Sequence, residues 1–93
     1  MTPRAALDQL DLLLATVRRC ERLIACHTDA SIRSPELTRA VAELRLGLMA
    51  DERHRSLEKL LAVSPIAALR IAIPTVRAAL VEEHTRMLAP RVA

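Results

Sequence analysis

The sequence contains no phenylalanine, tyrosine or tryptophan, one glycine and only two cysteines. Proteins that bind single-stranded RNA or DNA usually stack the bases on aromatic rings, so the missing aromatics argue against that class of function. Strands also favour aromatic and β-branched residues, whereas this chain is rich in the strong helix formers leucine and alanine, with sixteen of each. We therefore expect an all-α protein with no sheet and no single-stranded nucleic acid as partner.

Long hydrophobic runs and a signal sequence are absent as well. The longest uncharged stretch, residues 60–69, has ten residues and includes a proline, whereas a membrane-spanning helix needs about 20 apolar residues. The first residues lack the basic region, apolar core and cleavage site of a secretory signal. Cys20 and Cys26 lie in one helical segment and point to different faces, so they cannot pair with each other. We expect a cytoplasmic protein with no membrane partner.

Positive and negative side chains are nearly equal in number. Thirteen arginines and one lysine face eleven acidic residues, which gives a net charge of +3. Proteins that bind the nucleic acid backbone usually show a clustered basic stripe rather than a small excess. Glycine-rich loops that hold phosphate groups are also missing. The charge therefore allows duplex DNA as a partner only if a specific motif in the chain binds it.

Three similar dipeptides predict where helices begin. Each places a hydroxyl side chain, which can cap a helix, before a proline, which suits the first helical position. The three pairs are Thr2-Pro3, Ser34-Pro35 and Ser64-Pro65. They divide the chain into three helical regions within a single domain, residues 1–93.

Apolar residues at spacings of three and four predict the extent of the first two helices, residues 3–28 and 35–62. Each would be about 40 Å long, and the short polar turn between them makes them antiparallel neighbours. A third region follows, in which Pro74 lacks a backbone donor and clashes with the preceding turn. We therefore expect helices over 65–72 and 74–89. The prediction is a long antiparallel hairpin plus a Pro-kinked third helix, a three- to four-helix bundle.

The apolar faces of the two long helices are too wide for one hairpin to cover. Leu12, Leu13 and Leu23 add a second edge to the first helix, as Leu46 and Met49 do to the second. We expect a homodimer that builds a four-helix bundle from two hairpins. The expected interface residues are Leu10, Leu13, Leu14, Val17, Leu37, Val41, Leu44 and Leu48. The alternative is a monomeric three-helix bundle with its extra leucines scattered over the surface.

The stretch "LRIAIPTVRAAL", residues 69–80, resembles the turn and recognition helix of GntR-type winged helix-turn-helix repressors. The resemblance lies in Pro74, Thr75, Val76, Arg77 and Leu80. It implies a transcriptional regulator in which residues 64–80 contact duplex DNA. The contacting side chains would be Arg70, Thr75 and Arg77.

A second interpretation of the same stretch is structural. Leu69, Ile73, Val76, Leu80 and Met87 would form one core stripe. A basic residue, Arg70, stands where the repressor family usually has a turn glycine, and no hairpin follows to form a wing. If the stretch binds DNA, Thr75 and Arg77 should lie at an exposed helix N-terminus; if it does not, they should flank a buried stripe.

The segment "RAALDQLDLLLATVRR", residues 4–19, resembles the opening helix of the helical chorismate mutases. The resemblance rests on Arg4, Leu7, Asp8, Leu10, Asp11, Leu14 and Arg18. It implies three helices entwined as a dimer, with arginines from two chains binding a dicarboxylate. That family also needs a lysine late in the first helix and a Gln or Glu near the C-terminus. Here the only lysine is Lys59 and the only glutamine is Gln9, so Arg18 alone carries over.

No catalytic, metal or cofactor site follows from the remaining residues. The metal-binding candidates do not converge in the expected hairpin and lack the spacings of known zinc sites; they are Cys20, Cys26, His27, His54 and His84. The sequence therefore predicts a non-enzymatic module for protein–protein interaction or regulation that acts through self-association and an exposed leucine-rich surface. The alternatives are the DNA-binding regulator and a chorismate-mutase-like dimer without the full catalytic set.

Overall fold

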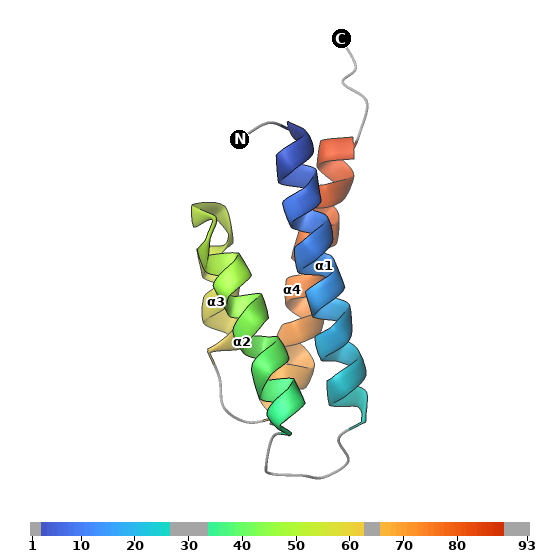
Figure 1. Cartoon of the computed structure of the whole chain (residues 1–93), viewed down its shortest axis with the longest axis vertical. Helices are drawn as coiled ribbons and strands as arrows, with labels where there is room; N and C mark the ends of the chain where they lie inside the picture. Colours follow the sequence, from blue (N-terminus) through green and yellow to red (C-terminus); the bar gives the residue numbers. More distant parts are fainter. Residues whose placement is uncertain (1–2, 27–33, 63–65, 89–93) are drawn as a thin grey trace.

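A computed structural model describes residues 3–26, 34–62 and 66–88 of the chain. Within these ranges every regular element is helical, which confirms the all-α prediction (Figure 1). The elements are α1 (Pro3–Ala25), α2 (Pro35–Met49), the short 3-10 helix η1 (Glu52–His54), α3 (Arg55–Leu61) and α4 (Ile66–Leu88). α1 ends at Ala25, earlier than the predicted end at residue 28.

The helices form an elongated bundle about 20 Å across, in which the two longest helices, α1 and α4, are each about 35 Å long. α1 packs against both α4 and α2, and α3 packs against α4. Successive helices run in opposite directions, and α2, η1 and α3 together form a short hairpin beside the α1–α4 pair (Figure 1). The N-terminal end of α1 and the C-terminal end of α4 extend past the tip of this hairpin. The bundle is therefore four helices thick at one end and two at the other.

The predicted start of α2 is confirmed by its cap. Ser34 is in an extended conformation, and its hydroxyl accepts a hydrogen bond of 3.1 Å from the backbone N–H of Leu37. Pro35 occupies the first helical turn, where its missing N–H has no partner to lose. Thr2, Ser64 and Pro65, which belong to the other two predicted start signals, lie outside the described residues.

The predicted helix over residues 35–62 is wrong, because the chain breaks it after Met49. Asp51 is extended, with φ −121° and ψ 125°, and its carboxylate accepts a hydrogen bond of 2.9 Å from the backbone N–H of Arg53. An aspartate that caps the next turn in this way competes with continuation of the helix. The break folds α3 back beside α2, so the long two-helix hairpin is replaced by a shorter one.

The predicted division at Pro74 is also wrong, because α4 runs from Ile66 to Leu88 with the proline in its interior. A proline inside a helix costs about 3 kcal/mol. Apolar side chains on both sides of it share one buried stripe; they are Leu69, Ile73, Val76 and Leu80. Each fully buried aliphatic side chain contributes about 1.5–3 kcal/mol, so burial of the stripe outweighs the cost of the proline.

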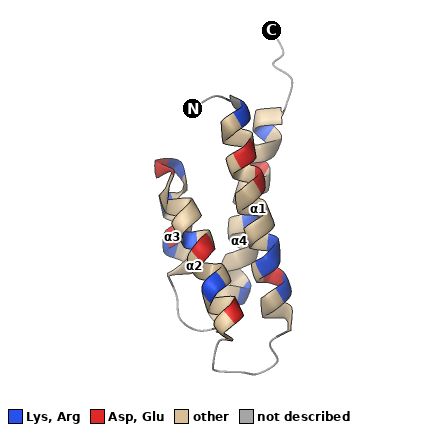
Figure 2. Cartoon of the chain, viewed as in Figure 1, with Lys and Arg blue, Asp and Glu red and all other residues tan. Residues whose placement is uncertain are grey.

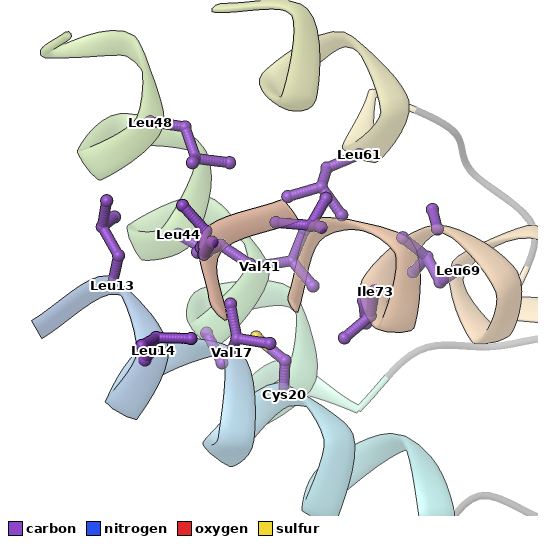
Figure 3. Packing of buried hydrophobic residues seen from close by; sticks show 14 of the residues in the cluster. Leu13, Leu14, Val17, Cys20, Val41, Leu44, Leu48, Leu61, Leu69 and Ile73 are labelled. Carbon is purple, nitrogen blue, oxygen red and sulfur yellow. The ribbon is translucent and has the colours of Figure 1, made fainter. Parts of the chain in front are cut away.

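One hydrophobic core joins all four α-helices (Figure 3). Side chains from α1, α2, α3 and α4 point toward a common centre, where Val17, Val41, Leu44, Leu61 and Ile73 lie close together. Each of these five is at most 2% exposed. Leu23, Leu57 and Met87 pack against the edge of this cluster.

Candidate interaction surface

The structure places all eight predicted interface residues in the core of the single chain. They are Leu10, Leu13, Leu14, Val17, Leu37, Val41, Leu44 and Leu48. The sequence periodicity found the buried stripe of each helix, but the covering surface comes from α3 and α4 of the same chain. These eight side chains present no free surface in the folded monomer.

The apolar side chains that do reach the surface belong to the second edge recognised in the sequence. Leu46 is 70% exposed, Leu12 is 64% exposed and Met49 is 53% exposed. Leu23 and Leu13, which were placed on the same edge, are instead packed against or inside the core. The other large exposed apolar residues are Leu60, Ile71, Val81 and Leu88.

Gly47 fixes how α1 and α2 cross. A Cβ atom at this position would lie 2.6 Å from Leu13 Cδ2, closer than real contacts allow. The absence of a side chain therefore lets Leu13 of α1 pack directly onto the α2 backbone. The single glycine of the chain therefore marks close packing of α1 on α2.

One contact indicates that Leu12 and Leu46 lie on the same side of the α1–α2 crossing. Arg19 of α1 forms an ion pair with Glu43 of α2. Residues seven apart on a helix share a face, as do residues three apart. Leu12 is seven residues before Arg19, and Leu46 is three residues after Glu43. We name Leu12 and Leu46 the seam patch. Met49, two residues after Gly47, lies about 200° around α2 and points away from α1.

The three residues expected to read DNA lie on an uninterrupted helix. Arg70, Thr75 and Arg77 are exposed and flank the buried stripe of α4. The Thr75 hydroxyl donates to the carbonyl of Ile71 at 2.9 Å, and the guanidinium of Arg77 pairs with Glu21 of α1 at 3.0 Å. No helix begins at Thr75, because α4 starts nine residues earlier at Ile66. The arrangement is the one expected of a core stripe rather than of an exposed helix N-terminus.

Arg18, the residue shared with the chorismate mutases, borders a hollow of about 390 Å³ between α1 and α4. In this hollow His84 Nε2 lies 2.8 Å from Asp11 Oδ1. The lining residues are Asp11, Leu14, Arg18, Val81, His84 and Thr85. Lys59 lies on α3 and Gln9 on α1, and neither lines the hollow. One arginine beside a histidine–carboxylate pair does not form the substrate-binding site of that family, which uses arginines from two chains.

A network of charged side chains, which no sequence pattern predicted, connects η1 at the tip of the hairpin to α4. His54 is only 3% exposed, and its Nε2 lies 2.5 Å from Glu83 Oε2. Arg53 pairs with Glu83 at 3.0 Å and with Asp51 at 2.8 Å. The hydrogen bonds from Arg53 lower the pKa of Asp51 from 3.8 to about 2.

The described part of the chain contains no cluster of potential metal ligands. Across residues 3–26, 34–62 and 66–88, no group of three or more His, Cys, Asp or Glu side chains is placed to hold a metal ion. Both cysteines are free thiols, with Cys20 buried and Cys26 exposed. Burial raises the pKa of the Cys20 thiol to about 11. His27, the remaining candidate ligand, lies outside the described residues.

Comparison with known proteins adds no functional assignment. No protein-family model, no curated protein and no solved structure matches this chain. Among the helices described here, none has both the length and the apolar character needed to cross a lipid bilayer. The exposed side chains of the bundle are therefore the basis for the function proposed below.

Proposed function

We propose that this protein is a non-enzymatic helical interaction module that associates with a second copy of itself through the seam patch. The observation that carries the proposal is the position of Leu12 and Leu46. These two large apolar side chains are each more than half exposed, and the α1–α2 crossing brings them to one side of the molecule. Contiguous exposed apolar side chains rimmed by polar residues are typical of protein interaction sites.

The size of the face supports a protein partner. A stable protein interface buries about 800 Å² on each side. The two longest helices have 23 residues each and are about 35 Å long, and the bundle is about 20 Å across, so its long face has the size that such an interface covers. The rim of the patch carries charged groups, among them the Arg19–Glu43 ion pair. An apolar centre with a charged rim is the usual composition of such interfaces.

The fourth helix supplies a natural control position. Ile71 is 74% exposed, slightly more than Leu46, and lies on the outer face of α4. Its exposed neighbours one turn away on that face are Ala67 and Thr75, so it stands alone as a large apolar side chain. Single apolar residues on a surface are ordinary and mark no site.

The proposal is tested by substituting these two equally exposed residues. The wild-type protein should show the mass of a dimer in light scattering, twice the chain mass of 10.3 kDa. Leu46→Arg should give a monomer, because it places a charge at the centre of the apolar patch, whereas Ile71→Arg should leave the mass unchanged. Circular dichroism should show that both variants keep their helical content, as expected for surface substitutions. A wild-type protein that stays monomeric at every concentration would refute the proposal, as would an equal effect of the two variants.

A further inference from the structure

The exposed face of α1 carries opposite charges at equal distances from its middle. Asp8 lies seven residues before Ala15, and Arg22 lies seven residues after it. All three side chains are exposed. Because residues seven apart share a helix face, the three form one line along the outside of α1. Asp8 and Asp11 lie in the N-terminal half of the helix, after Arg4 in its first turn, and three arginines lie in its C-terminal half together with Glu21 (Figure 2).

The two outer charges are not neutralised within the described part of the chain. Neither Asp8 nor Arg22 forms an ion pair with another described residue. They are about 21 Å apart along the helix axis, at 1.5 Å per residue, so they cannot reach each other. Arg19 and Asp11, which lie closer to the middle, are already paired with Glu43 and His84. Arg4 and Arg18 also have no ion pair within the described residues, but Asp8 and Arg22 are the opposite charges that lie at equal distances from Ala15.

We propose that the second copy docks with its α1 antiparallel to α1 of the first, about a two-fold axis that passes at the level of Ala15. The inference rests on the proposed function, since it names the orientation of the partner on the same surface. In this arrangement Asp8 of each chain lies opposite Arg22 of the other, and this pairing occurs twice. In a parallel arrangement Asp8 would face Asp8 and Arg22 would face Arg22, which like charges disfavour.

The same axis brings the apolar patches together. The contacts Leu13–Gly47 and Arg19–Glu43 give the register of α2 on α1. Interpolation between them places Leu46 at the level of Ala15. Residues that lie on a two-fold axis meet their own copies, so Leu46 contacts Leu46 of the second chain. The small side chain of Ala15 at the centre allows the two α1 helices to approach closely, because interaxial distance depends on the side chains at the contact.

Charge reversal tests the orientation. Asp8→Arg alone and Arg22→Asp alone should each weaken self-association about tenfold, because each puts like charges at two symmetric positions on the rim. A mixture of the two variants should form a heterodimer of wild-type affinity, since every reversed charge then faces an opposite one. The combined variant Asp8→Arg/Arg22→Asp should also regain wild-type affinity. Arg86→Asp on α4 is the matched control and should change nothing. Sedimentation equilibrium measures the association constant of each of the four variants and of the mixture.

The outcomes separate this inference from the proposed function. If the wild type dimerises and Leu46→Arg abolishes the dimer, but the mixture shows no recovery, the antiparallel orientation is wrong and the interaction surface stands. If no dimer forms at any concentration, both are wrong. Recovery in the mixture supports both. At 1 M salt, where screening extends only about 3 Å, the differences among the charge variants should largely vanish.

A cross-link locates the axis independently. In a Cys26→Ser background, Leu46→Cys should form a disulfide-linked dimer under mild oxidation, because the two Cα atoms would lie within the roughly 7 Å that a disulfide spans. Ile71→Cys, which is equally exposed, should stay unlinked. Cys20 can remain, since it is buried and its raised pKa keeps the thiol protonated. A dimer that Leu46→Cys fails to link would place the axis elsewhere and overturn the inference.

Discussion

Two junctions hold the α2–η1–α3 hairpin in the bundle, and they use different chemistry. At the α1–α2 crossing, Leu13 packs onto Gly47 beside the apolar core, and one exposed ion pair, Arg19–Glu43, lies at the edge. At the hairpin tip, His54 and Arg53 contact Glu83 of α4 through ion pairs and hydrogen bonds. Apolar packing is non-directional and scales with buried area, whereas charged contacts require specific partners. The crossing should therefore supply stability, and the tip should fix the position of the hairpin on α4.

The largest expected effect is at the apolar junction. Leu44 is fully buried on α2, and Leu44→Ala should lower the free energy of unfolding by about 2–5 kcal/mol. Leu46→Ala removes the same atoms from a side chain that is mostly exposed in the monomer, so it should change the stability by less than about 0.5 kcal/mol. Urea unfolding followed by circular dichroism, at concentrations where the protein is monomeric, measures both. Similar losses in the two variants would show that α2 does not pack as described.

A smaller effect is expected at the charged junction. Glu83→Ala leaves the ring of His54 buried without its partner, which should cost about 1–3 kcal/mol. The adjacent residue is a matched control, because Glu82 is exposed and its ion pair with Arg86, at 3.4 Å, lies on the surface of α4. Glu82→Ala should therefore cost less than about 0.5 kcal/mol. Equal stabilities of the two variants in thermal unfolding would mean that the tip contact contributes nothing.

The smallest effect is confined to acidic pH. Arg53 lowers the pKa of Asp51 from 3.8 to about 2, so the folded state favours the ionised carboxylate. A group with a depressed pKa stabilises the fold above its unfolded value and loses that contribution as pH falls through the folded value. The wild type should be more stable than Asp51→Asn at pH 6. The difference should shrink between pH 4 and pH 2, where Asp51 becomes protonated. If the melting temperatures of the wild type and Asp51→Asn differ by the same amount at pH 6 and at pH 2, this assignment is wrong.

The comparison also explains which parts of the fold could be predicted. The apolar stripes of α1, α2 and α4 have the spacing of a helix, and Ser34 has a side chain that can cap one. The sequence alone therefore predicted the stripes and the cap. The break at Asp51 was missed because the same sequence, "ADERHRSLEKLL", also fits a continuous helix with ion pairs one turn apart. A partner 29 residues away, Glu83, contacts His54 in the broken form. Sequence spacing contains no information about that contact.

Pro74 illustrates the opposite error. Local chemistry predicts a division there, and the residues around it match a helix-turn-helix pattern. The buried stripe that passes from Leu69 to Leu80 holds the helix together, because burial against α1 and α3 exceeds the cost of one missing hydrogen bond. The same reasoning places Thr75 and Arg77 beside a core rather than at a helix start.

The candidate site was predicted in part. The sequence identified two wide apolar faces and the residues on them, including Leu12, Leu46 and Met49. It could not say which members would be covered by the chain's own helices, since that depends on where α3 and α4 pack. The eight central residues went into the core, and the second edge remained outside.

The amino-acid sequence by itself determined that this protein is helical, because its leucine and alanine content and its three- and four-residue spacing leave no competing pattern. It also determined the cap of α2 and the buried stripe of each long helix, which depend on neighbours within a few residues. Only the tertiary structure decided that α2 ends at Met49, that α4 continues through Pro74 and that the seam patch stays exposed. Those three outcomes depend on contacts between residues far apart in the chain, whose free energies exceed the local preferences.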